Sequence, residues 1–245
     1  MEKELKMFEK LEKFQITILS VVLALGLIGA VSLATNNLSN DKISVTGSAY
    51  KIVQSDSARL EFQITTRKPS KQEAYNAVKA QLPIVKKFLE NKGFKDIDIM
   101  ASNGYNTYRY APNGNMTNDI AYYNLSQTVI VKSNEVQKIK ELSTEIESLL
   151  DQGIDIEIVN TEYFYSKLSD LKVELLKDAT TDAKDRANAM LKATHNHPGK
   201  IQSVNMGVFQ ITPVDSTNVS DMGINDTTTI EKKVTAVANV VFRIK

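Results

Sequence analysis

Residues 58–65 read ARLEFQIT, an unbroken alternation of apolar and polar side chains. Successive side chains of a β-strand point to opposite faces, so this pattern predicts a strand with one face in the core and the other in water. A solvated face is typical of antiparallel sheets, because parallel sheets are usually covered on both sides. The stretch therefore favours an antiparallel sheet with a single buried face.

Further strands are indicated on both sides of this stretch. Residues 43–47 alternate before it, and residues 97–110 and 120–131 form two long extended segments after it. The loop between these two segments, residues 111–119, is rich in Pro, Gly and Asn, which favours a long hairpin. Residues 212–229 have almost no apolar periodicity and predict an exposed loop. The remaining predicted strands lie at residues 154–158, 204–208 and 234–244, the last of them central in its sheet.

A long helix is predicted at residues 71–92, between the 58–65 strand and the hairpin. It follows a capping box in which Ser70 caps the first turn and Glu73 reaches back to it. The apolar residues that follow recur at helical spacing, and Gly93 supplies the C-terminal stop.

Two more long helices are predicted further along the chain. Asn134 is the expected cap of a helix that carries one apolar stripe and ends at Gly153. The third helix covers residues 168–193 and has alanine at every fourth position in its middle, at Ala179, Ala183 and Ala187. Such a row of small side chains lets a helix lie close against a sheet.

Strands that arrive in hairpins between three long helices predict an α+β domain over residues 43–245. We expect an antiparallel-dominated mixed sheet, or two such sheets, packed against the helices. The order of strand, helix and strand occurs twice along the chain, which indicates two subdomains.

A charge-free run, FQITILSVVLALGLIGAVSLA, occupies residues 14–34 ahead of this domain. As a helix it reaches about 31 Å, close to the hydrocarbon thickness of a membrane. Four lysines precede the run, and the flank richer in basic residues stays in the cytoplasm. We therefore predict a short cytoplasmic N-terminus at residues 1–13, a single-pass transmembrane helix at 14–34, a linker at 35–42 and an extracytoplasmic domain.

A cleaved signal peptide is the alternative interpretation of the same run. Ser32 and Ala34 offer small side chains at the positions that a signal peptidase reads. The run is longer than the usual signal core of about 7–15 residues, which favours an uncleaved signal anchor. Both interpretations place the folded domain outside the cytoplasm, in the periplasm or at the cell exterior.

The composition narrows the possible chemistry. The chain has no cysteine, which excludes thiol nucleophiles, thiolate metal sites and disulfides. It has 30 Lys and Arg against 29 Asp and Glu, with the signs evenly mixed. Because nucleic-acid binding needs a concentrated basic surface, we expect no nucleic-acid partner.

The order of these segments resembles the SIMPL domain family of bacterial envelope and secreted proteins, over residues 43–245. The resemblance is carried by residues 43–47, Asp56, residues 123–129, Gly153, residues 179–187, Gly199 and residues 234–242. The chain departs from the family pattern at Ala49 and Ser55, where relatives often have Gly and Pro. The resemblance implies a two-part α+β domain outside the cytoplasmic membrane and, in some relatives, large ring-like oligomers. It implies no established catalytic residues, and roles in envelope integrity or oxidative stress are suggested for some members.

Few residues suggest catalysis or metal binding. His195 and His197 can share a metal, but a zinc site needs three or four ligands and the chain has no other His and no Cys. The 212–229 loop contains oxygen ligands of the kind that calcium prefers, but these residues, Asp215, Asp221, Asn225 and Asp226, do not have the spacing of a calcium loop. No nucleophile elbow, H-E-x-x-H motif or phosphate loop occurs. We therefore expect no metal, no cofactor and no enzymatic activity.

Tyrosines concentrate in the predicted hairpin, at Tyr105, Tyr108, Tyr110, Tyr122 and Tyr123. Aromatic residues on neighbouring strands either fill a sheet face or present a partner surface. Core or cross-strand packing is the simpler interpretation of these five residues. The alternative prediction is that they form an interface with a second subunit or a ligand, built on the 105–123 hairpin.

These features together predict a membrane-anchored, non-enzymatic extracytoplasmic protein. We expect a homo-oligomer that acts by self-assembly or by contact with envelope components, with the envelope or oxidative-stress role that the resemblance implies. The alternative is a monomeric module, secreted after signal-peptide cleavage, that binds a small ligand or a peptide. Self-assembly predicts a large particle, whereas binding predicts a monomer that its ligand stabilises.

Overall fold

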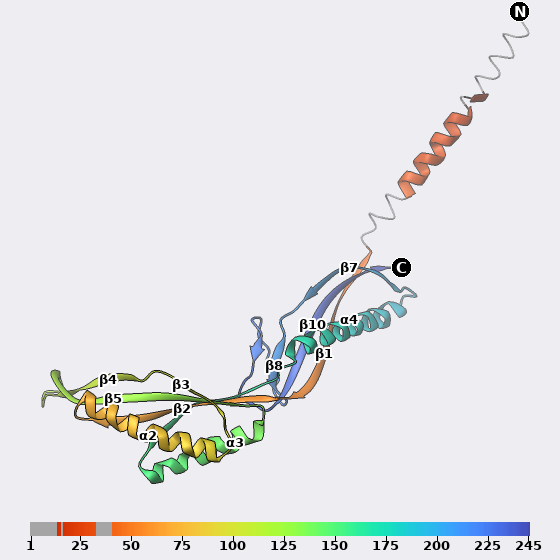
Figure 1. Ribbon diagram of the computed structural model, residues 1–245. Helices are drawn as coiled ribbons and strands as arrows, with labels where there is room; N and C mark the ends of the chain where they lie inside the picture. The colour runs from red at the N-terminus through yellow and green to blue at the C-terminus, as the bar shows by residue number, and fades with distance from the viewer. Residues whose placement is uncertain (1–13, 16, 33–40) are drawn as a thin grey trace, which may run out of the picture.

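The computed structural model describes residues 14–15, 17–32 and 41–245. Residues 41–245 form an elongated α+β domain with two five-stranded sheets (Figure 1). All strand pairs are antiparallel except one short parallel pair. Each sheet packs its own hydrophobic core. The predicted α+β class with antiparallel-dominated sheets is confirmed.

We call the first sheet the hairpin sheet. Its strands follow the order β3-β5-β2-β6, and β4 also pairs with β5. The bounds are β2 Ser57–Lys68, β3 Asp96–Ile99, β4 Asn103–Tyr110, β5 Met116–Ser133 and β6 Asp155–Phe164. The predicted hairpin is the β4–β5 pair, and its loop contains Gly114 at φ 82°. The 58–65 stretch lies in β2, between β5 and β6.

Helices cover one face of the hairpin sheet only (Figure 1). They are α2 (Lys71–Asn91), α3 (Val136–Glu145) and the 3-10 helix η1 (Ile146–Gln152). Beneath them, Leu60, Phe62 and Ile64 of β2 are fully buried. The predicted cap of α2 is confirmed, because the Ser70 hydroxyl accepts the Glu73 backbone N–H at 3.2 Å.

The prediction for the second helix is wrong in two respects. Asn134 does not cap it; the Ser133 hydroxyl instead accepts the Glu135 backbone N–H at 3.0 Å, just before α3. The helix also breaks into α3 and η1, so residues 41–245 have four helices where the sequence predicted three long ones. The tighter η1 ends at Gly153, whose φ of 75° is the left-handed conformation that glycine adopts readily.

We call the second sheet the terminal sheet, because it joins the two ends of the domain. The last strand, β10 (Glu231–Ile244), pairs from Glu231 to Arg243 with β1 (Lys42–Gln54), and it lies between β1 and other strands, which confirms that β10 is central. On its other side β10 pairs with β7 (Pro198–Met206) and with β8 (Gln210–Pro213). The helix α4 (Leu168–Lys192) packs on β1 and β10, and Ala179, Ala183 and Ala187 are fully buried there.

The segment expected as a plain loop, residues 212–229, contains regular structure. Residues 210–213 form β8, and Ile224–Asn225 form β9, which pairs with β8 in parallel. The Gln210 side chain holds the intervening turn, since it donates to the Ser220 carbonyl at 2.7 Å and accepts the Ser220 N–H at 3.3 Å. These contacts join residues ten apart, so no local apolar period marks them.

Asp56, which lies between β1 and β2, forms hydrogen bonds to the connection between the two sheets. Its carboxylate accepts the backbone N–H of Ser166 at 2.8 Å and the Ser166 hydroxyl at 2.6 Å. Its own N–H donates to the Phe164 carbonyl at 2.9 Å. The start of β2 is thereby fixed to the connection between β6 and α4.

The predicted transmembrane segment is described only in part. Residues 14–15 and 17–32 are helical, and their side chains are exposed; in Figure 1 this helix stands apart from the domain. Three parts of the chain lie outside the described residues: 1–13, 16 and 33–40. They include the expected cytoplasmic N-terminus, the cleavage position at Ala34 and most of the linker. No helix within the described ranges has both the length and the mean hydropathy needed to span a membrane.

Candidate binding surface on the open face of the hairpin sheet

In the part of the chain that the structure describes, no helix covers the face of the hairpin sheet opposite α2 and α3. Because paired residues of antiparallel strands share a face, the strand registers identify the side chains on it. The alternation of β2 places Arg59, Glu61, Gln63, Thr65 and Arg67 there. Their neighbours on the adjacent strands are also mostly polar. The open face is therefore a polar platform that an outside molecule can reach.

A hollow of about 450 Å³ lies on this face, and we call it the polar groove. Its floor is a band of uncharged polar side chains on β2 and β5, formed by Gln63, Thr65, Asn124 and Ser126. Asp155 and Glu157 of β6 line one side, and Arg67 and Tyr105 line another part of its border. The pairings Thr65 to Asp155 and Gln63 to Glu157 fix the acidic side directly beside the floor.

Asn124 is held in one orientation at one end of the groove. Its amide nitrogen donates to the Thr107 hydroxyl at 2.7 Å, and its amide oxygen accepts from Arg67 Nε at 3.3 Å. The Arg67 guanidinium also lies over the Tyr122 ring, 4.4 Å from its centroid, in a cation–π contact. These contacts orient the side chains at one end of the groove before anything binds.

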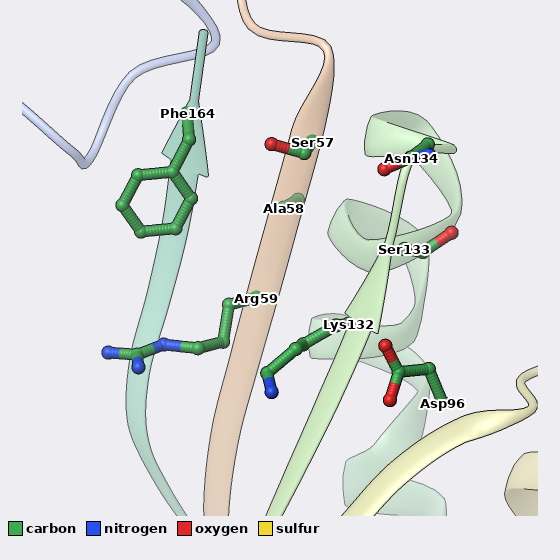
Figure 2. A pocket seen from close by; sticks show the side chains of 8 residues that line it. All are labelled: Ser57, Ala58, Arg59, Asp96, Lys132, Ser133, Asn134 and Phe164. Carbon is green, nitrogen blue, oxygen red and sulfur yellow. The ribbon is translucent and has the colours of Figure 1, made fainter. Parts of the chain in front are cut away.

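A second hollow, of about 490 Å³, lies near the other end of the same sheet. Figure 2 shows Phe164 of β6, Arg59 of β2 and Lys132 of β5 around it, with Asp96 beside Lys132. Ser57, Ala58, Ser133 and Asn134 complete the lining. Phe164 is the only aromatic residue among these eight.

Carboxylates already pair with both cations of the second hollow. Arg59 donates to Glu162 through its Nε at 2.9 Å and through a second guanidinium nitrogen. Lys132 binds Asp98 at 2.6 Å, and this hydrogen bond and the carboxylate charge raise the pKa of the lysine. With Asp96 also present, the hollow offers no uncompensated positive charge, so it is a poor site for an anion.

A protein-family model matches most of the chain. Residues 43–242 match the SIMPL family, described as a protein of unknown function (DUF541). This chain belongs to the SIMPL family. The resemblance seen in the sequence is thus confirmed over almost the whole predicted domain. A search of curated proteins gave no match.

The SIMPL domain does not gather the five predicted interface tyrosines on one face. Tyr105 lines the polar groove and Tyr122 stacks with Arg67 on the open face. Tyr123 packs on the opposite face against Ala74, Val78 and Leu125. Tyr108 is half-buried next to a register shift of β4, and Tyr110 is exposed at the hairpin end. A subunit interface at this hairpin stays a prediction.

The other candidates from the sequence lie away from the groove. His195 and His197 are exposed in the turn between α4 and β7. Of the acidic loop residues, Asp215 and Asp221 are exposed, whereas the Asp226 side chain is buried. Within residues 14–15, 17–32 and 41–245, no three side chains of the ligating types are grouped closely enough to hold a metal ion.

Asp226 and Lys232 form a buried ion pair that no pattern in the sequence indicates. Their side chains are 7% and 3% exposed, and Lys232 Nζ lies 3.4 Å from the carboxylate and 2.8 Å from the Asp226 carbonyl oxygen. Burial opposes ionisation of Asp226, but hydrogen bonds from Thr229 and Thr228 and the charge of Lys232 outweigh it and lower its pKa to about 2. Burial lowers the pKa of Lys232, against the opposing effect of Asp226. The pair fixes the loop before β10.

Proposed function

We propose that this SIMPL-domain chain is a membrane-tethered, extracytoplasmic and non-enzymatic module that acts by assembling with further copies of itself. The observation that carries the proposal is the free edge of β7. Within the described part of the chain, β7 pairs only with β10, so its outer backbone groups face no other strand. Such an edge is a template for pairing with a second chain.

The side chains of β7 and the residues that follow it support the same proposal. Four apolar residues in this segment are 42–61% exposed: Ile201, Val204, Met206 and Val208. Val204 and Met206 pair with Val240 and Ala238, which are fully buried under α4. The apolar face of the terminal sheet therefore continues past the helix onto β7. A second copy that covered this strip would bury apolar surface and pair the strand edge together.

The opposite edge of the terminal sheet is protected in a way that β7 is not. The Ser48 backbone N–H of β1 donates to the Asp182 carboxylate of α4 at 2.8 Å. Arg186 donates to the same carboxylate oxygen at 2.8 Å. A charged group bound at a strand edge discourages pairing with another chain. This contrast favours β7 as the assembly edge.

The charge-free run of residues 14–34 and the lysines before it support the proposed tether. Tethers hold copies in one membrane plane and raise their effective concentration, so a weak edge contact becomes sufficient for assembly. Contact with envelope components, and the envelope or oxidative-stress role suggested for relatives, are part of the same proposal. The non-enzymatic assignment rests on the absence of a catalytic motif in the sequence.

Light scattering on the full chain in detergent micelles tests this proposal. After subtraction of the detergent mass, we expect a multiple of the 27.3 kDa chain mass that persists across a tenfold dilution. A mass equal to one chain at every concentration would contradict self-assembly. It would instead favour the monomeric binding module.

A further inference from the structure

We propose that the polar groove on the open face of the hairpin sheet is a binding site for a neutral oligosaccharide. The groove lies on a different sheet from the β7 edge, so this inference goes beyond the proposed assembly and does not depend on it. Three features of the groove support this inference: the chemistry of its floor, one exposed aromatic ring and the charge of its border.

The floor offers the hydrogen-bonding groups that adjacent sugar hydroxyls require. Gln63 and Asn124 are planar amides with donors and acceptors, and Thr65 and Ser126 have hydroxyl groups that do both. A sugar hydroxyl is likewise a donor and an acceptor, so a row of them can match this mixed set. The volume of about 450 Å³ is within the range of about 300–1,000 Å³ for small-molecule sites.

Tyr105 supplies a flat apolar surface next to this floor. Its side chain is 70% exposed, although it lines the groove and pairs with Asn124 across the β4–β5 ladder. The C–H face of a sugar ring is apolar and stacks on an aromatic ring, whereas the hydroxyls at its rim remain free to bond. An aromatic face beside amide groups therefore suits a sugar better than a fully polar or a fully apolar ligand.

The backbone before Tyr105 keeps β4 close against β5. A Cβ atom at Gly104 would lie 2.8 Å from Leu125 Cδ1 and 2.9 Å from the Asn124 carbonyl oxygen. The absence of a side chain at Gly104 thus permits the close pairing that sets Tyr105 beside Asn124. Asn124 is itself oriented by Thr107 and Arg67. A site with oriented groups loses less conformational entropy when a ligand binds.

The charge of the border selects against other ligand classes. Asp155 and Glu157 outnumber the single cation, Arg67, whose guanidinium is already shared between Asn124 and the Tyr122 ring. An anionic ligand therefore meets net repulsion. A peptide anchored by apolar side chains would need a deep apolar pocket, and the lining contains only one fully aliphatic residue, Leu125, which is buried. A neutral polyhydroxyl ligand is the remaining match.

Saturation-transfer difference NMR on the full chain in detergent micelles tests the proposal, because it observes the ligand and tolerates a large complex. The probes are hexasaccharides of four neutral types: β-1,4-glucan, α-1,4-glucan, β-1,4-mannan and β-1,4-linked N-acetylglucosamine. We expect saturation transfer to at least one probe, strongest at ring C–H protons. Tyr105→Ala should reduce the affinity at least tenfold. Tyr110→Ala is the matched control, because Tyr110 is equally exposed but lies outside the groove.

The other outcomes overturn the proposal. No transfer to any of the four probes with the folded parent chain would exclude neutral oligosaccharides. Equal loss of transfer in Tyr105→Ala and Tyr110→Ala would place binding elsewhere on the hairpin.

A basic hexalysine peptide is the competing probe, and Glu157→Gln separates the two ligands. If hexalysine bound and no oligosaccharide did, and if Glu157→Gln weakened hexalysine binding, the groove would be a site for cationic peptides. The micelle mass reports assembly separately, so the two proposals fail independently.

Discussion

A methyl group on Gly47 would lie 2.1 Å from the carbonyl oxygen of Ala179. The same hypothetical Cβ would lie 2.4 Å from the backbone nitrogen of Ala183. Gly47 of β1 thus faces the backbone of α4, and no side-chain rotation there can make room. The small side chains at both positions allow the helix and the sheet of the terminal half to pack at backbone contact.

Gly47→Ala should therefore destabilise the domain strongly. Overpacking of a core usually costs about 1–3 kcal/mol, and we expect a cost of about 3 kcal/mol or more because the clash is with backbone atoms. Gly207→Ala is the matched control, since a Cβ at Gly207 would meet Val237 at an ordinary 3.5 Å. Thermal unfolding followed by circular dichroism measures both variants. Equal melting temperatures for the two would refute the packing argument.

Much of the fold is predictable from the sequence because its signals are local. The alternation in residues 58–65 predicts β2 and its buried face, and the Ser70 to Glu73 cap predicts the start of α2. The alanine row of α4 predicts close packing against a sheet. The partner of that row, Gly47, is more than 130 residues away, and one glycine in a strand does not reveal what approaches it.

Asp226→Asn should lower the melting temperature at neutral pH. It should also make the melting temperature fall less steeply as the pH decreases from 4 to 2. The variant leaves the Lys232 ammonium buried without its carboxylate, which costs about 3 kcal/mol, or roughly 6–12 °C in melting temperature. The folded-state pKa of Asp226 is about 2, below its ordinary 3.8, so its contribution is complete above about pH 4 and is lost as the pH falls towards 2. Melting temperatures between pH 2 and pH 7 check this.

The control for that variant is Asp221→Asn, an exposed acid in the same loop. It should change the melting temperature little at any pH, because a surface substitution without contacts is usually close to neutral. If Asp226→Asn retained the parent's steep loss of stability between pH 4 and 2, then carboxylates other than Asp226 would account for that loss.

The open face of the hairpin sheet was only partly predictable. The alternation in β2 indicates which side chains are solvated, so Gln63 and Thr65 could be placed on an open face from sequence. The groove depends on the register that sets Asp155 beside Thr65 and Asn124 beside Tyr105. The β2–β6 part of that register joins strands far apart in the chain and includes a shift between Glu61 and Phe62. A single sequence contains no direct signal for it.

The hairpin tyrosines give a test that separates two assembly surfaces. If the predicted tyrosine interface holds the copies together, the double variant Tyr108→Ala and Tyr110→Ala should have the mass of a single chain by light scattering. If β7 alone holds them together, the mass should equal that of the parent. Circular dichroism must show that the variant is folded. An unchanged mass would remove the tyrosine interface.

Substitution of the exposed β7 residues tests the assembly edge directly. Val204→Lys with Met206→Lys places two like charges on a strip that a second copy would cover, and charged side chains at strand edges oppose pairing between chains. Because these side chains are 42% and 61% exposed, the folded monomer should tolerate the change within about 1 kcal/mol. We therefore expect the single-chain mass together with a melting temperature near that of the parent at high dilution.

Val219→Lys is the control for this variant, because it adds a lysine at a position that is 82% exposed in the β8–β9 loop. It should retain the parent mass. If the β7 variant and the loop variant kept the same oligomeric mass, the β7 edge would not be the contact.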